Sequence, residues 1–431
     1  MSLPTLETPT PESYRLSWQE EGVVMEVTRI REERGDLISE LVVMTTMPED
    51  QLSRVKFNML SDRAITTLAN KLEKRTGNTY DFDKLLTQAA ELVITRYRQG
   101  DPLVDLTQVK RRETRWLLKP FIENAGTSVL FAEGGSYKSF FALSMAVTVA
   151  TGVPILGLEP EYTCPVAYLD FEADSETHAM RMDAICAPHN LVVPEDQLFY
   201  RFEVQSLSSA AESLRIMFAE RNIGMVIVDS VGMARGGAPE AAEFTIKLAR
   251  SSRSFVIPSL WIDHLAKSDI NSKAKGMPFG SVYTQNTARL VWRMERDHKE
   301  GVDGLNVLVS NVKANNGPLS PRQGYAMKIA NNELDIPQSV EYTRLAQADL
   351  PDELADGLSI REQIIRVLNN EQRPMKAHEI TEILQEDQGT VGKTLRRGLE
   401  KTFGREPDEK GVMEWHLLEY PDEDMSADSP S

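Results

Sequence analysis

The stretch from Thr127 to Leu143, TSVLFAEGGSYKSFFAL, places two glycines, a lysine and a serine between an apolar strand-like run and an apolar helix-like run. Small residues such as Gly134 and Gly135 let successive backbone N–H groups turn toward an anion. Lys138 is placed to reach the β- and γ-phosphates of a nucleotide, and Ser139 to hold Mg²⁺ at the N-terminus of the following helix. The stretch therefore predicts a phosphate-binding loop whose ligands are ATP and Mg²⁺.

The loop departs from the pattern G-x-x-x-x-G-K-[ST], because Ala132 and Tyr137 stand at the two glycine positions. We expect Ser136 and Tyr137 to offer backbone N–H groups to the phosphates, with the Tyr137 ring pointing away from them. The alternative is an ordinary Gly-Gly turn that precedes a buried helix.

The chain has 431 residues, a length typical of two or three domains, and its composition of 41% hydrophobic and 26% charged residues suits large buried cores. Two cysteines, Cys164 and Cys186, fit a reducing cytoplasm better than a disulfide framework. No secretory pattern opens the sequence. The longest apolar stretch, Phe140 to Leu158, is interrupted by Gly and Pro and favours a buried helix over a membrane span. The net charge of −17 restricts any nucleic-acid contact to local basic segments.

Patterning divides the chain into an N-terminal α+β module, an ATPase-like α/β domain, a linker, a compact C-terminal domain and an acidic tail that we expect to be disordered. The expected bounds are 1–104, 105–340, 341–357, 358–420 and 421–431. In the N-terminal module we expect a loose leader over residues 1–12, then short strands, then helices over Ser61–Arg75 and Asp81–Gln99.

The central segment alternates strands and helices, and several of its strands are nearly continuous apolar runs. Such runs are typical of parallel strands covered on both faces, so the predicted fold class is α/β with a mainly parallel sheet. The expected strands lie at 128–131, 166–170, 225–229, 259–263, 288–292 and 305–309.

Polar residues follow three of these strands, at the sheet edge where open α/β sheets bind ligands. Asp229 is placed to hold Mg²⁺, with capping of the next segment as the alternative. Glu172 is the candidate base that orients the attacking water, and Asp170 and Asp174 compete for that role. His264 is the candidate sensor of the γ-phosphate, with a structural cap as its alternative.

Residues 358 to 420 read as three helices followed by a hairpin, which is the element order of a winged helix. The cations of the third helix and its end are candidates for contact with DNA phosphates or a major groove. They are Lys393, Arg396, Arg397 and Lys401. A solvated face of a protein-docking domain is an equally weighted alternative.

With its motifs in this order, the segment from about 110 to 335 resembles the RecA-like P-loop ATPases, in the branch of plasmid RepA-type hexameric replicative helicases and related phage and mobile-element ATPases (AAA_25-like). The order is phosphate loop, Glu172, Asp229-Ser230, Asp263-His-x-x-Lys267, Gly280-Ser281 before Arg289, and Lys313-Ala-Asn-Asn-Gly317.

The resemblance implies a homo-oligomeric ring, usually of six subunits, with ATP between protomers and single-stranded DNA in the central channel. It also implies that Lys313 reaches the neighbouring subunit's nucleotide. Asn315 stands where the family often has arginine, and asparagine lacks the fixed charge that arginine would bring to the transition state. Either Arg289 or Lys313 would therefore have to stabilise the transition state, or hydrolysis would be slow.

Two function classes follow. The first is an ATP-hydrolysing motor that handles DNA, a replicative helicase or a related loader. The second is an ATP-switched DNA-binding regulator or scaffold with little turnover. Single-stranded-DNA-stimulated ATPase activity favours the first, and site-specific duplex binding favours the second.

Overall fold

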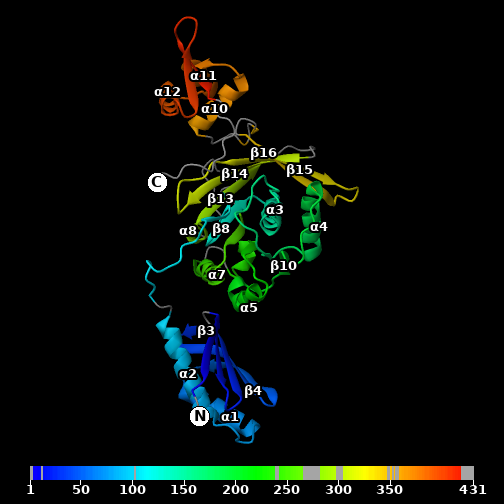
Figure 1. Cartoon of the computed structure of the whole chain (residues 1–431), viewed down its shortest axis with the longest axis vertical. Coiled ribbons are helices and arrows are strands. Elements are labelled where there is room, and N and C mark those ends of the chain that lie inside the picture. Colours follow the sequence, from blue (N-terminus) through cyan, green and yellow to red (C-terminus); the bar gives the residue numbers. More distant parts are fainter. Residues whose placement is uncertain are drawn as a thin grey trace. The chain divides into compact units, whose positions relative to one another are not determined.

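The computed structural model describes residues 3–10, 13–100, 103–237, 242–265, 282–297, 304–346, 350–351, 354 and 359–418. The chain divides into two compact units. Figure 1 shows the whole chain with its helices and strands labelled. One unit comprises Met1–Glu113 and Ser209–Glu220, and the other comprises Thr114–Ser208 and Arg221–Ser431.

The N-terminal module is a five-stranded antiparallel meander followed by two helices that share its core. Its elements are β1 (Thr5–Thr10), β2 (Ser13–Trp18), β3 (Val23–Glu33), β4 (Asp36–Thr46), β5 (Glu49–Asn58), α1 (Asp62–Arg75) and α2 (Phe82–Gln99). Ser61 and Asp81 accept hydrogen bonds from backbone N–H groups in the first turns of α1 and α2, which fixes where the helices begin. The expected loose leader is wrong for residues 5–10, because they pair with β2.

The central domain contains a nine-stranded sheet in the order β10-β9-β11-β12-β8-β13-β14-β15-β16. The strands from β10 to β13 are parallel, and those from β13 to β16 are antiparallel. The strands are β8 (Thr127–Ala132), β9 (Val166–Asp170), β10 (Leu198–Phe202), β11 (Met225–Asp229), β12 (Ser259–His264), β13 (Leu290–Arg296), β14 (Gly304–Ala314), β15 (Gln323–Asn331) and β16 (Pro337–Leu345). A hairpin of β6 (Trp116–Leu118) and β7 (Ile122–Glu123) precedes them. The predicted mainly parallel α/β core is thus confirmed.

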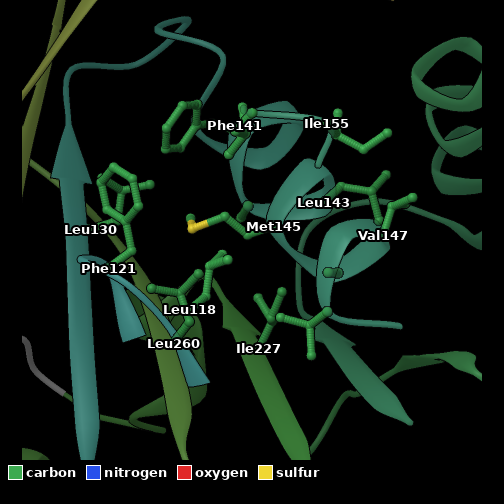
Figure 2. Packing of buried hydrophobic residues seen from close by; sticks show 14 of the residues in the cluster. Leu118, Phe121, Leu130, Phe141, Leu143, Met145, Val147, Ile155, Ile227 and Leu260 are labelled. Atoms are coloured by element: carbon green, nitrogen blue, oxygen red, sulfur yellow. The ribbon is translucent and has the colours of Figure 1, made fainter. Parts of the chain in front are cut away.

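The helices of this part of the sequence are α3 (Lys138–Thr151), α4 (Ser175–Cys186), η1 (Ala187–His189), α5 (Leu207–Glu220), α6 (Val231–Ala234), α7 (Ala242–Ser254) and α8 (Val282–Thr287). All but the first two residues of α5 belong to the unit that contains the N-terminal module. Helix α3 is buried on all sides, so its continuous apolar sequence reflects enclosure. Figure 2 shows Phe141, Met145 and Val147 of α3 among core residues that include Leu130 and Leu260 of the strands. Helix α4 contacts both edge strands of the sheet, β10 and β16, and it also contacts α3.

The long apolar stretch from Phe140 to Leu158 is not one helix, because α3 ends at Thr151. Among the described residues, no helix combines the length and apolar character needed to span a membrane.

Strand β16 runs through the predicted domain boundary at residue 340, so the expected linker over 341–357 is wrong at its start. Val340 is fully buried and Tyr342 packs against the same core, whereas Glu341 is exposed. This alternation is typical of a half-buried strand. Its exposed charged residues are why the sequence favoured a linker here.

The C-terminal domain consists of three helices and a three-stranded sheet in the order β17-β19-β18. Its elements are α10 (Ile360–Glu371), β17 (Met375–Lys376), α11 (Ala377–Leu384), α12 (Gln388–Arg397), β18 (Phe403–Pro407) and β19 (Met413–Leu417). The three helices and the β18-β19 hairpin follow the predicted order, whereas β17 between α10 and α11 was not predicted. The assignment as a winged helix stays a prediction. Lys401 lies beyond the end of α12, because the helix stops at Arg397 before Gly398. The predicted tail, 421–431, lies outside the described residues.

Candidate functional site

The predicted phosphate loop joins the carboxyl end of β8 to the N-terminus of α3. The Lys138 ammonium group turns back across the loop and donates to the carbonyl oxygens of Glu133 (2.8 Å) and Ala132 (3.4 Å). Burial lowers the Lys138 pKa, opposed by the nearby carboxylates, Asp229 first. A Cβ atom built on Gly134 or Gly135 would meet no atom within 4 Å, so the space beside these two glycines is open. An anion that enters would replace the two carbonyls as the partner of the lysine.

Tyr137 adopts a left-handed backbone conformation, with φ of 63° and ψ of 24°, immediately before α3. Its ring packs against the core, with the Phe140 ring centroid at 5.9 Å and the Arg296 guanidinium at 5.9 Å. Glycine adopts this conformation without strain, which explains why the motif has glycine here. The ring thus packs against the core, and the expectation that the Tyr137 backbone N–H faces the phosphates stays a prediction.

Ser139 and Asp229 come together at the helix N-terminus although they are 90 residues apart in sequence. The Ser139 hydroxyl donates to Asp229 Oδ2 at 2.7 Å, and the buried Tyr168 hydroxyl donates to the same oxygen at 2.6 Å. Burial raises the Asp229 pKa, while the bonds from Tyr168 and Ser139 act to lower it. A hydroxyl beside a carboxylate is an oxygen donor set of the kind Mg²⁺ prefers, so the pair fits the expected metal.

Glu172 follows β9 and His264 ends β12, at the carboxyl ends of two strands that are separated in the sheet by β11. Glu172 Oε1 lies 3.7 Å from His264 Nε2 and accepts a hydrogen bond from the Ser230 hydroxyl. The imidazole of His264 beside the carboxylate is the main reason that the Glu172 pKa is lowered. Both side chains are nearly half exposed, at 47% and 43%, so an ionised carboxylate faces solvent next to an imidazole. A water molecule has access to this carboxylate.

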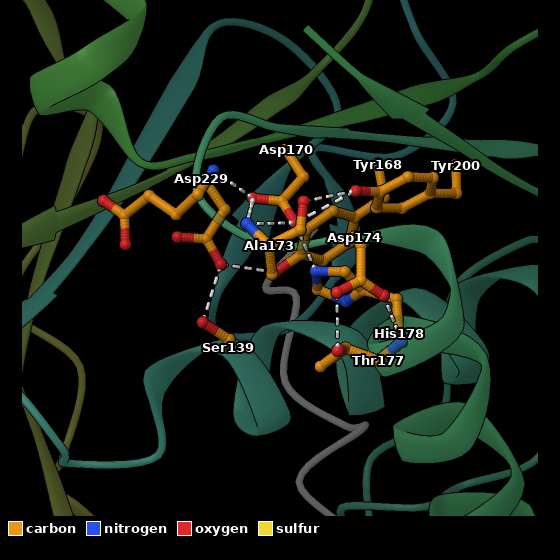
Figure 3. Close-up of polar contacts among 10 residues, drawn as sticks. Ser139, Tyr168, Asp170, Ala173, Asp174, Thr177, His178, Tyr200 and Asp229 are labelled. Atoms are coloured by element: carbon orange, nitrogen blue, oxygen red, sulfur yellow. Dashed lines mark hydrogen bonds and ion pairs between the residues drawn. The ribbon is translucent and has the colours of Figure 1, made fainter.

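The two carboxylates that competed with Glu172 point elsewhere. Asp174 caps α4 by accepting from the Thr177 N–H at 2.8 Å. Asp170 is buried and accepts from the backbone N–H groups of Glu172 and Ala173. Burial raises the Asp170 pKa, but the hydrogen bonds to His178 and the two N–H groups outweigh burial and lower it (Figure 3). Glu172 alone of the three predicted candidates has a side chain that contacts His264.

The strand that carries His264 is anchored by a buried ion pair beneath it. Arg235 Nη2 lies 2.9 Å from Asp263 Oδ2 and 2.8 Å from the hydroxyl of Thr284 in α8. Burial raises the pKa of Asp263 to about 6 in spite of Arg235. Lys267, Gly280 and Ser281 of the predicted motifs lie outside the described residues.

Arg289 and Lys313 lie at the opposite edge of the sheet from the phosphate loop. The Arg289 N–H donates to Thr127 O at the amino end of β8. At about 3.3 Å per residue, Ala132 at the other end is about 16 Å away along the strand. The Lys313 ammonium group donates to the carbonyls of Gln285 (2.7 Å), Asn286 (3.2 Å) and Ala288 (2.8 Å) at the end of α8. Neither residue can reach the nucleotide loop of its own chain.

The cations predicted to contact DNA all lie on the surface of the C-terminal domain. Lys393, Arg396 and Arg397 of α12 and Lys401 beyond it are exposed. Arg396 Nε donates to the Gly392 carbonyl at 2.9 Å, and within the described part of the chain no ion pair occupies any of the four. Their charges are therefore available to an external anion.

A family model for AAA domains (AAA_25) matches residues 95–268. This part of the chain is similar to AAA domains. With the sheet and loop described above, the central domain is a RecA-like P-loop ATPase domain. The matched range includes Lys138, Glu172, Asp229 and His264. It ends before α8, β13 and β14.

Among solved structures, a KaiC-like protein from the hyperthermophilic archaeon Pyrococcus horikoshii OT3 is similar to this chain at 14% sequence identity. The TM-score is 0.38, and the match covers 53% of this chain and 93% of that one. No curated protein matches the chain.

Three residues of the site were not predicted from the sequence: Tyr168, His178 and Tyr200. Ser230 was named only as part of the motif Asp229-Ser230, without a role of its own. Tyr168 and Ser230 adjoin predicted positions, since one lies within the strand before Glu172 and the other follows Asp229. His178 and Tyr200 come from α4 and β10, and no sequence spacing indicates that they meet Asp170.

Proposed function

We propose that this ATPase hydrolyses ATP in order to move or remodel DNA, as a replicative helicase or helicase-like motor of a plasmid, phage or mobile element. The observation that carries the proposal is the meeting of Lys138, Ser139, Asp229, Glu172 and His264 at one edge of the sheet. Lysine for phosphates, an oxygen pair for Mg²⁺ and a solvent-facing carboxylate are the groups that phosphoryl transfer to water needs.

In this proposal Glu172 accepts the proton of, or orients, the water that attacks the γ-phosphate. Its lowered pKa keeps it ionised at neutral pH, as that role requires. Mg²⁺, held by Ser139 and Asp229, supplies charge neutralisation when it is bound with ATP. Lys138 exchanges its two carbonyl partners for phosphate oxygens, and His264 links the state of the γ-phosphate to β12.

The proposal includes a ring of identical subunits. Arg289 and Lys313 are separated from their own loop by the length of β8, so a role at the nucleotide requires a second copy of the chain. A head-to-tail contact would bring one subunit's Arg289 edge to its neighbour's phosphate loop, and such contacts close into rings when the rotation allows.

We assign DNA contact to the C-terminal domain. We also propose that the ring binds single-stranded DNA. The exposed cations at α12 support contact with phosphates despite the net charge of −17. Both cysteines are free and buried thiols, which supports a cytoplasmic setting.

The decisive test is ATPase activity with and without single-stranded DNA, together with the particle mass in ATP. We expect stimulation by the single strand and an oligomer. Lys138→Ala should abolish nucleotide binding, and Glu172→Gln should bind ATP and lose turnover. Absence of stimulation and of strand separation across a range of salt concentrations would refute the motor.

The C-terminal assignment is tested by changing Arg396 and Arg397 together to alanine. DNA affinity should fall, and its salt dependence should weaken, because two phosphate contacts are lost. Arg373→Ala is the matched control, since Arg373 is as exposed but already paired with Glu371 and Glu379. Equal DNA affinity in the double variant and the control would leave the domain as a protein-docking module.

One observation favours the second function, an ATP-switched DNA-binding regulator with little turnover. Lys313 is engaged by the end of α8, and Asn315 brings no charge to the same segment. This function predicts a preferred duplex site and slow hydrolysis. Footprinting without a preferred site would count against it.

A further inference from the structure

Asp170 holds the backbone of the loop that presents Glu172. It ends β9, is 1% exposed, and its Oδ1 accepts the N–H of Glu172 at 2.9 Å. The Ala173 N–H lies within hydrogen-bond distance of both oxygens, at 3.3 and 3.2 Å. Because these bonds fix the peptide planes on both sides of Glu172, the position of Asp170 determines where the Glu172 side chain starts.

His178 holds Asp170 in turn. Its Nε2 atom lies 2.7 Å from Asp170 Oδ2, and its side chain is 5% exposed. The imidazole lies between two aromatic rings, with centroid distances of 4.6 Å to Tyr168 and 5.1 Å to Tyr200 (Figure 3). The Tyr200 hydroxyl also lies 3.3 Å from Asp170 Oδ2 and donates to Ala173 O at 2.9 Å. The imidazole therefore has little freedom to shift, and the carboxylate follows it.

We propose that His178 and Asp170 are positioning residues for hydrolysis, through which helix α4 sets the location of Glu172. The inference rests on the proposed function of Glu172 as the base. His178 lies on α4 and Asp170 on β9, so their bond connects a helix that packs on α3 to the edge that carries the reaction. A misplacement of about 1 Å at such a group reduces turnover by about a hundredfold.

The pair acts on turnover and leaves ATP binding unchanged. Neither residue contacts the phosphate loop among the described interactions, whereas Lys138 and Ser139 do the binding. We therefore expect His178→Ala to lower kcat ten- to a hundredfold while the KM for ATP stays within about twofold.

His178→Gln is the rescue variant, because its amide nitrogen can donate from nearly the place of Nε2. It should recover most of the lost kcat. Thr177→Ala is the matched control on the same turn of α4: it removes a hydroxyl that contacts Asp174 at 3.1 Å and not Asp170. Its kcat should equal that of the unchanged protein.

A double-mutant cycle with Glu172→Gln separates the two proposals. If His178 acts through Glu172, His178→Ala should cause no further loss in the Glu172→Gln background. Normal turnover in Glu172→Gln alone would overturn the base assignment. A large loss in Glu172→Gln together with normal kcat in His178→Ala would overturn only the positioning pair.

Asp170→Asn serves if His178→Ala fails to fold, since it keeps the side-chain volume. An amide offers one accepting oxygen in place of two, so the N–H groups of Glu172 and Ala173 and the imidazole cannot all keep their partner. We expect reduced kcat with retained binding of a fluorescent ATP analogue. Unchanged kcat in the folded Asp170→Asn protein would overturn the proposal.

Discussion

Replacement of Tyr137 by glycine and by alanine should reverse the usual stability order of these two residues. Both changes remove the ring and its contacts with Phe140 and Arg296, so that loss cancels when the two variants are compared. Alanine keeps the left-handed strain of φ 63°, about 1–2 kcal/mol for a residue with a Cβ atom. Glycine removes it but costs about 0.5–1 kcal/mol in backbone entropy.

We therefore expect Tyr137→Gly to be more stable than Tyr137→Ala by up to about 1.5 kcal/mol. Ala179 supplies the control, because it lies exposed in the middle of α4 and Ala179→Gly should cost about 1 kcal/mol there. Thermal unfolding measures both, using the transition that ATP raises, since ligand binding identifies the central domain. A Tyr137→Ala variant as stable as Tyr137→Gly, or more so, would refute the left-handed backbone as the reason for glycine in the motif.

Three further predictions follow from single contacts. Tyr168→Phe removes a 2.6 Å bond to Asp229, so half-maximal ATPase activity should need more Mg²⁺, and a magnesium titration that is unchanged would contradict it. His264→Ala removes the main cause of the lowered Glu172 pKa, so that pKa should rise and the acid limb of the kcat–pH profile should move to higher pH. An acid limb that stays at the same pH would show that His264 does not lower the Glu172 pKa. Lys313→Met removes three carbonyl contacts at the end of α8 and should lower stability by about 1 kcal/mol in urea unfolding. Equal unfolding midpoints would show that those contacts are not stabilising.

Strands and loops were predictable where the polarity of their residues indicates whether they are buried or lie at the ligand-binding edge. The apolar runs that end at Asp170 and Asp229 fit only strands covered on both faces, and a polar residue after such a strand lies at the ligand-binding edge. Sequence also located the N-terminal helices to within a residue, because Ser61 and Asp81 are capping residues followed by helical periodicity.

Features that depend on long-range pairing were not predictable. Strand β1 is polar and gains its structure from pairing with β2, and β16 has one buried residue, Val340, among partly buried and exposed ones. The contact between His178 and Asp170 was likewise not predictable, because it depends on how α4 packs against the sheet. Backbone pairing and helix packing, not local propensity, decide these positions.

The placement of Arg289 and Lys313 at the edge opposite the phosphate loop has a consequence for how chains work together. Under the proposed assembly, each subunit gives a lysine-bearing loop to one site and a charged edge to the next. A subunit whose loop is disabled still carries an intact charged edge, and a subunit with a disabled edge still binds ATP. Two defective chains would therefore complement one another at half of their shared contacts, although neither alone would hydrolyse ATP.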